Sequence, residues 1–151
     1  MKKQQVLIAT KMVHRQQCHT NRDSMLSIHK LIHQLESQGV ISKTHSPLNS
    51  LIWQVHKANR EWRLMVDYHG LNEVTLPLSA AVSDMLEVQY ELESKAAKKY
   101  STTDIANTFF SIHLATECGP QFIFTWRGIQ YTWNLFPQGW KHSLAICHGL
   151  I

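Results

Sequence analysis

Asp104 is the acidic residue of this sequence whose surroundings most suggest a chemical role. Residues 100–103 have the composition of a short strand, and small side chains follow Asp104 before the aromatic pair Phe109 and Phe110. A carboxylate at the end of a strand can hold a divalent metal ion at the edge of a sheet. It can also cap a short helix that begins at Ile105, because Asp is a favoured N-cap residue. The local pattern leaves both interpretations open.

Basic side chains gather at the tip of a predicted hairpin. Residues 51–55 and 62–68 are strand-like, and the polar residues 56–61 connect them. Lys57, Arg60 and Arg63 could therefore bind phosphate groups through charge-assisted hydrogen bonds. The alternative is a charged turn that only faces solvent, which is common at hairpin tips.

Two histidines occupy one face of a predicted helix. Apolar residues recur at helical spacing over residues 23–38, with Asp23 or Ser24 as the expected cap and Gly39 as the expected end. His29 and His33 lie four residues apart there and could ligate a metal ion. A solvated helix face is the alternative, since no third ligand stands nearby.

The remaining pattern indicates an α+β fold with flanking helices around an antiparallel sheet. We expect a loosely ordered arm over residues 1–22 with a short strand at 6–9, and one folded unit over 23–151. Residues 69–72 predict a turn, and the residues from 83 to 94 predict a helix. Residues 121–126 and 129–135 predict a second hairpin, and residues 141–151 a last helix.

Composition places few limits on function. The 151 residues are 44% hydrophobic and 17% charged, which fits one compact domain rather than a disordered chain. The net charge of +4 permits a polyanionic partner without requiring one. The three cysteines lie far apart, so we expect free thiols and a reducing compartment. No apolar run approaches the ~18 residues of a membrane span, so we expect a soluble, intracellular protein with no membrane partner.

Three segments carry a resemblance to a known family. The run WRLMVDYHGLN spans residues 62–72, DIANTFFSI begins at Asp104, and LFPQGWKHS begins at Leu135. In order and spacing they resemble the fingers strand, motif A and the Pro-Gln-Gly segment of retroviral reverse transcriptases. With the lead-in over 47–72, the resemblance covers about residues 25–151. The chain is identified by this resemblance as a fingers and palm fragment of a Pol polyprotein, most similar to endogenous-retrovirus types.

The resemblance implies a role for several residues in RNA-directed DNA synthesis. Arg63 and Lys57 would bind phosphate groups, with His56 as the alternative to Lys57. Phe109 would lie under the sugar, where a flat ring leaves no room for a ribose 2′-hydroxyl. Gln138 would help to hold the incoming nucleotide and the template. The backbone that would approach the triphosphate belongs to four residues: Ile105, Ala106, Asn107 and Thr108.

The resemblance also makes Asp104 the catalytic residue and a magnesium ligand. Polymerases of this family use two Mg²⁺ ions, and they need a further pair of aspartates in a Tyr-x-Asp-Asp hairpin after the Pro-Gln-Gly segment. The 151 residues contain no such hairpin, and Glu117 is their only acidic residue after Asp104. We therefore expect a fragment truncated before that motif, with an incomplete magnesium site and no activity alone.

The implied partners are an RNA or DNA template-primer and a deoxynucleotide. We also expect an open sheet edge that allows self-association or the binding of a partner chain. Two alternatives to a polymerase fragment stay open: a non-catalytic nucleic-acid-binding remnant, or a translated remnant with no selected role. A true binder would lose affinity steeply as salt rises.

Overall fold

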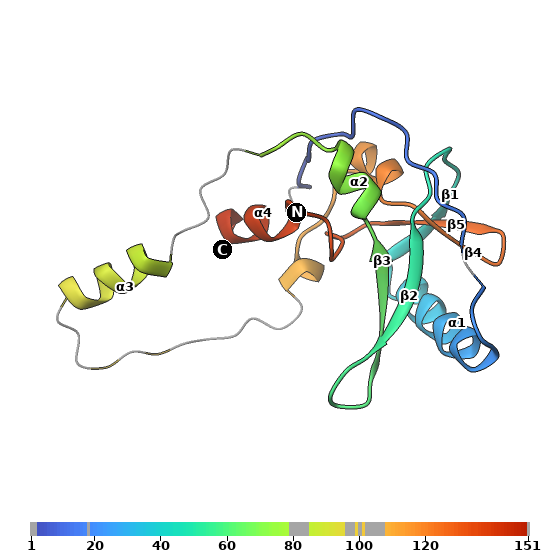
Figure 1. Ribbon diagram of the computed structural model, residues 1–151, viewed down its shortest axis with the longest axis horizontal. Coiled ribbons are helices and arrows are strands. Elements are labelled where there is room, and N and C mark those ends of the chain that lie inside the picture. The colour runs from blue at the N-terminus through green and yellow to red at the C-terminus, as the bar shows by residue number, and fades with distance from the viewer. Residues whose placement is uncertain are drawn as a thin grey trace.

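Two antiparallel sheets organise the described part of the chain (Figure 1). One has three strands in the order β1 (Ile41–Thr44), β5 (Ile129–Trp133) and β4 (Phe124–Trp126). The other is the hairpin of β2 (Leu51–His56) and β3 (Trp62–Asp67). Helices flank these sheets, which confirms the predicted α+β class. The computed structural model describes residues 3–17, 19–78, 85–95, 99, 101 and 108–150.

Helix α1 (Arg22–Ser37) begins two or three residues earlier than the expected caps imply. Its cap is Asn21, whose side-chain oxygen accepts a hydrogen bond from the Ser24 backbone N–H at 2.8 Å. The prediction that Asp23 or Ser24 caps this helix is therefore wrong. Asp23 lies inside the first turn, where its negative charge interacts favourably with the positive end of the helix dipole.

The end of α1 follows the predicted glycine. Gly39 has a φ of +71°, a conformation that L side chains rarely adopt. Its N–H donates to the Glu36 carbonyl at 3.0 Å, and the Val40 N–H donates to the Leu35 carbonyl at 2.9 Å. These paired bonds satisfy carbonyls at the end of the helix and turn the chain into β1.

The β2–β3 hairpin confirms the prediction from alternation. Its strands pair from Leu51 with Asp67 to His56 with Trp62. One face packs on the core through buried aliphatic side chains, while the opposite face exposes Trp53 and Val55. The buried residues of the hairpin are Ile52, Leu64 and Val66.

Strand β1 and helix α2 (His69–Val74) were not predicted from the sequence. Strand β1 has four residues and pairs with β5 far along the chain, bringing Ile41 opposite Trp133. Helix α2 forms where residues 69–72 predicted only a turn, so that prediction is wrong. Neither element has a local pattern of its own, and both depend on distant packing.

The second predicted hairpin is present with shorter strands. A 3₁₀-helix (Thr116–Gln121) includes the first residue of the predicted 121–126 strand, and β4 begins only at Phe124. Arg127 and Gly128 form the turn as expected, with φ of 49° and 76°. Two successive residues with positive φ match the twist of a two-residue hairpin.

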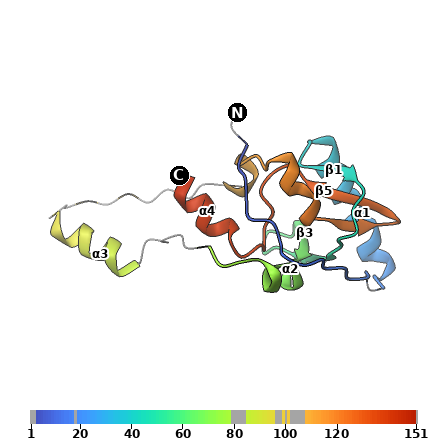
Figure 2. The same cartoon turned by 90° about the horizontal axis from the view of Figure 1, so that it is seen from above.

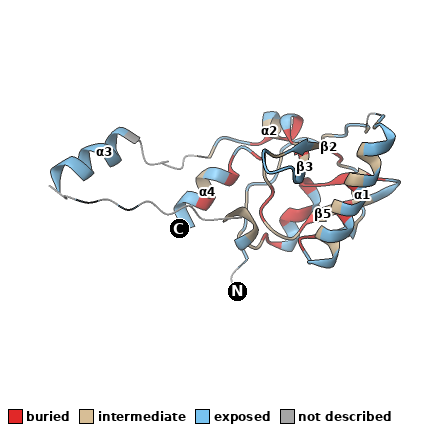
Figure 3. Cartoon of the chain, turned by 90° about the horizontal axis from the view of Figure 1, so that it is seen from below, coloured by how far each residue is buried: buried red, intermediate tan, exposed pale blue. Residues whose placement is uncertain are grey.

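Aromatic rings fill the core between the sheets and the last helix, α4 (Ser143–Leu150). Figure 3 shows this buried interior in red. Phe122 meets Tyr68 at 5.6 Å between ring centroids and Trp140 at 5.2 Å, both edge to face. The free, buried thiols of Cys118 and Cys147 agree with the expected lack of disulfides, and Cys18 lies outside the described residues.

The N-terminal segment, residues 3–17, runs along this body (Figure 2). Gln4 exchanges backbone hydrogen bonds with His113 and Ala115, each 2.8 Å long. The Ala9 N–H donates to the Gln121 side chain at 2.9 Å. Residues 6–9 do not form the short strand that was expected, and the division of the chain at residue 22 stays a prediction.

Helix α3 (Met85–Ser94) stands apart from the other elements in Figures 1 and 2. It occupies the range predicted for it, although the expected caps Ser83 and Asp84 lie outside the described residues. The predicted strand at 100–103 also falls largely outside them. Within the described residues, no helix is long and apolar enough to cross a membrane.

Candidate phosphate-binding groove

A groove of about 680 Å³ lies between α1, the β2–β3 hairpin and β5. It brings together residues that the sequence singled out in two segments: Lys57 and Arg63 of the β2–β3 hairpin, and Gln138 in the Pro-Gln-Gly loop. Gln138 is distant in sequence from the hairpin, so its placement beside Lys57 and Arg63 is a property of the fold. The wall from α1 adds polar side chains, namely Ser27, Lys30, Gln34 and Gln38.

The groove carries an excess of positive charge. Lys30, Lys57, Arg60 and Arg63 line it, and Glu61 is the one acidic residue of the described lining. Clustered cations in a concavity raise the local concentration of anions. The planar fork of arginine also matches two phosphate oxygens at once.

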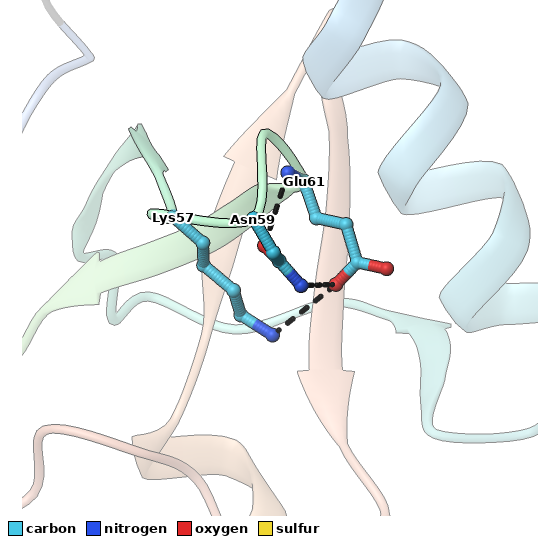
Figure 4. Close-up of polar contacts among 3 residues, drawn as sticks. All are labelled: Lys57, Asn59 and Glu61. Carbon is cyan, nitrogen blue, oxygen red and sulfur yellow. Dashed lines mark hydrogen bonds and ion pairs between the residues drawn. The ribbon is translucent and has the colours of Figure 1, made fainter.

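The hairpin tip is closed by its own polar contacts (Figure 4). The Lys57 ammonium lies 3.6 Å from a Glu61 carboxylate oxygen. The Asn59 side-chain amide donates to the same oxygen at 2.9 Å, and its carbonyl accepts from the Glu61 N–H at 3.2 Å. The bond from Asn59 and the charge of Lys57 together lower the pKa of the Glu61 carboxyl below its ordinary value.

Apolar and aromatic side chains form another part of the groove. Phe110 stacks on Trp133 with 6.0 Å between centroids and 17° between planes. Phe110 is half-buried against the core and also lines the groove. Trp62 lines the groove too, and the edge-to-face contact at 4.5 Å joins it to His56.

Gln138 is positioned by a loop that is anchored on two sides. The Ser143 hydroxyl donates to the Pro137 carbonyl at 2.7 Å, which fixes the loop to α4. The Asn72 amide donates to the Gly139 carbonyl at 3.2 Å, which fixes it to α2. Gly139 has a φ of +88°, so a residue with a side chain would be strained there.

The segment predicted to carry catalysis is only partly described. Thr108 and Phe109 belong to a 3₁₀-helix (Thr108–Ser111), and Phe109 is half-buried against the core. Their predicted roles beside the nucleotide stay predictions. The same holds for the residues that lie outside the described ranges: Asp104, Ile105, Ala106 and Asn107.

No metal cluster is present among the described residues. In this part of the chain, no three or more His, Cys, Asp or Glu side chains form a group that could hold an ion. His29 and His33 lie with their ring centroids 6.3 Å apart and gain no third ligand in that part of the chain. The assignment of magnesium to Asp104 therefore stays a prediction.

Sequence reasoning missed the contribution of α1 and of Glu61 to this groove. Ser27, Lys30, Gln34 and Gln38 follow one another at spacings of three and four, which places them on one helix face. That spacing was available in the sequence, but nothing local indicated which element the face would oppose.

A comparison of sequences decides the family of this chain. The profile of the family described as reverse transcriptase (RNA-dependent DNA polymerase) matches residues 55–151, a range that includes Lys57, Arg63 and Gln138. The chain belongs to the reverse transcriptase family. The resemblance of its motifs to retroviral Pol reverse transcriptases is thereby confirmed, while the endogenous-retrovirus type stays a prediction.

Relatives of this reverse transcriptase chain are much longer proteins. It is 36% identical over 123 residues to the Gag-Pol polyprotein of Walleye dermal sarcoma virus, covering 81% of this chain and 7% of that polyprotein. It is 33% identical over 135 residues to the Pro-Pol polyprotein of Feline foamy virus, covering 88% of this chain and 11% of that polyprotein. The chain thus spans about a tenth of these relatives.

A solved structure shares the fold of this reverse transcriptase chain. The foamy viral protease-reverse transcriptase dRH, in complex with double-stranded DNA, superposes with a TM-score of 0.77 and 28% identity. The match covers 99% of this chain and 25% of that one. The fold therefore corresponds to one part of a larger polymerase.

Proposed function

We propose that this chain is the fingers and palm part of an RNA-directed DNA polymerase, and that its groove binds phosphate groups of the template-primer or the incoming deoxynucleotide. The observation that carries the proposal is the convergence of Lys57, Arg63 and Gln138 on one groove.

The chemistry of the groove suits a nucleotide or nucleic-acid strand. Arg63 and Lys57 offer a fork and a point charge to phosphate oxygens. The ring of Phe110 gives an apolar surface for a sugar or base. The Gln138 amide both donates and accepts, so it can bind a polar edge that the cations do not reach.

The complex of the foamy viral relative supports the same partner class. That protein is bound to double-stranded DNA and shares 28% identity with this chain. Because the chain corresponds to only part of it, transfer of the partner to this chain is our proposal.

Catalysis requires more than the groove. We place Asp104 as a ligand of Mg²⁺, which when bound would activate the primer hydroxyl and neutralise the triphosphate. After Asp104, Glu117 is the only acidic residue of the 151, and Gln5 donates to its carboxylate at 3.0 Å. Two-metal sites need several carboxylates about two ions that lie about 3.5–4 Å apart. We infer that these 151 residues alone bind without catalysing nucleotide addition.

Binding of an RNA/DNA hybrid tests the proposed function. The affinity of the purified 151-residue chain for a fluorescent template-primer is measured by anisotropy over a range of salt. Arg63→Ala should weaken binding by about ten- to 150-fold, since bonds to charged groups contribute about 1.5–3 kcal/mol. The slope of log K against log salt should also fall in magnitude by about one.

Lys95→Ala serves as the control, because Lys95 pairs with Glu91 on α3 away from the groove. Equal affinities for Arg63→Ala, Lys57→Ala and the control would contradict the proposal, and absence of salt-dependent binding would favour a remnant without a role. Primer extension with magnesium and deoxynucleotides is run beside Asp104→Asn. Extension that disappears in that variant would overturn the inference of inactivity.

A further inference from the structure

The Lys57 ammonium already has an anionic partner. Among the groove's four cations, it is the one that forms an ion pair with an acidic residue of the described chain, at 3.6 Å from Glu61. The side chain of Lys57 is 37% exposed and that of Glu61 is 66% exposed, so solvent and ligands can reach both.

We propose that Glu61 tunes the affinity of the groove by competing with phosphate for Lys57. The carboxylate occupies the ammonium in the free protein and gives it up when a phosphate group binds there. This inference rests on the proposed function, because it takes phosphate as the ligand of Lys57.

The backbone of the tip holds Glu61 in this competing position. The Lys57 N–H donates to the Glu61 carbonyl at 2.8 Å, and the Arg60 N–H donates to the Lys57 carbonyl at 2.9 Å. Arg60 has a φ of 66°, which closes the turn tightly. Both side chains therefore leave the same small loop, and Figure 4 shows them pointing toward each other.

Asn59 restrains the carboxylate further. Its amide donates at 2.9 Å to the Glu61 oxygen that faces Lys57, so this oxygen contacts both Asn59 and the Lys57 ammonium. A glutamate carboxyl is ionised at neutral pH, where a phosphate ligand is also charged. The contacts with Asn59 and Lys57 lower the pKa of Glu61 further in the same direction.

The other cations of the groove do not require this exchange. In the part of the chain that the structure describes, Lys30, Arg60 and Arg63 form no ion pair with an acidic residue. A phosphate that binds them gains an attraction without releasing a carboxylate. Exposed ion pairs are weak, so the competition from Glu61 should correspond to a change in affinity of up to about fivefold.

Glu61→Gln tests the competition, because glutamine keeps an acceptor for Asn59 and removes the charge. Two probes are titrated at low salt: dTTP, and a fluorescent RNA/DNA hybrid. Affinity for at least one probe should rise about two- to fivefold, and the probe that responds identifies the source of the phosphate. Glu61→Ala should give a gain in the same direction.

Glu91→Gln is the matched control for net charge. Glu91 also forms an exposed i,i+4 pair with a lysine, at 3.9 Å on α3. Its removal changes the net charge of the chain equally, so a purely global effect would raise affinity as much as Glu61→Gln does.

A double-mutant cycle separates local competition from other effects. In a Lys57→Met background, Glu61→Gln should raise affinity no more than Glu91→Gln does. A gain that persists without Lys57, or no gain in Glu61→Gln and Glu61→Ala, would overturn the inference. Failure of the proposed function would differ, since Lys57→Met and Arg63→Ala would then bind as well as the unaltered chain.

Discussion

At the scale of single residues, Phe122 connects parts of the core that are far apart in sequence. Its ring is fully buried at 0% exposure, between the rings of Tyr68 at the end of β3 and Trp140 before α4. The Tyr68 hydroxyl also donates to the Phe122 carbonyl, over 3.4 Å. Burial raises the pKa of the Tyr68 phenol well above its ordinary value, so it stays neutral in this core.

Phe122→Ala should lower the free energy of unfolding by about 3–5 kcal/mol, because it removes a large buried ring and leaves a cavity. Urea denaturation followed by tryptophan fluorescence measures the change. Ile129→Ala is the comparison, since Ile129 is 41% exposed at a hairpin turn and its loss should matter far less. Similar costs for the two variants would contradict the packing described for Phe122.

The groove residues show what the sequence could and could not predict at this scale. Motif resemblance singled out Lys57, Arg63 and Gln138, and the structure places them on one groove. Phe110 and Glu61 were not predicted to line it. Phe109 and Phe110 are adjacent in the same 3₁₀-helix, yet only Phe110 lines the groove. Which of the two rings does so depends on packing against Trp133, a residue distant in sequence.

At the scale of elements, α1 supplies one wall of the groove and begins at a specific cap. Asn21→Ala should reduce the free energy of unfolding by about 1 kcal/mol, the usual effect of removing an N-cap side chain. Asn21→Asp keeps an acceptor for the Ser24 N–H and should be close to neutral. Thermal unfolding monitored by circular dichroism measures both variants. A larger loss in Asp23→Ala than in Asn21→Ala would show that the cap lies at Asp23 instead.

Elements with a strong local signal were predicted well. The β2–β3 hairpin follows from alternation and a polar tip, and α1 follows from apolar residues at helical spacing. Strand β1 and helix α2 were not predicted, because each has only a few residues and is stabilised by partners distant in sequence. The predicted strand over residues 121–126 is shorter in the structure, because its alternation begins before pairing starts at Phe124 and the 3₁₀-helix (Thr116–Gln121) includes its first residue.

At the scale of the whole molecule, Asn49 joins three parts of the chain. Its backbone exchanges 3.0 Å hydrogen bonds with Val13 and Arg15 of the N-terminal segment, and its side chain donates to the Arg15 carbonyl. The Thr125 hydroxyl, on β4, donates to the Asn49 side-chain oxygen at 2.7 Å. Asn49 stands just before β2, so these bonds tie the base of the hairpin to the segment and to the larger sheet.

The same segment packs closely over α2. A Cβ atom on Gly70 would lie 2.9 Å from a methyl group of Val13, nearer than ordinary contacts allow. The N-terminal segment is therefore packed against the rest of the protein at Val13. Loss of the hydrogen bonds at Asn49 should free this segment and loosen the base of the hairpin that carries Lys57 and Arg63.

Asn49→Ala should lower the free energy of unfolding by about 1–3 kcal/mol, because it leaves the part-buried Arg15 carbonyl and Thr125 hydroxyl without their partner. Limited proteolysis should then cleave the N-terminal segment faster, as judged by mass spectrometry of early fragments. Lys95→Ala, which removes an exposed side chain just after α3, should change stability by no more than about 0.5 kcal/mol. If cleavage and stability are the same in both variants, Asn49 does not hold the segment. If Asn49→Ala also weakens binding of the RNA/DNA hybrid while Lys95→Ala does not, the segment contributes to the groove by fixing the hairpin from its base.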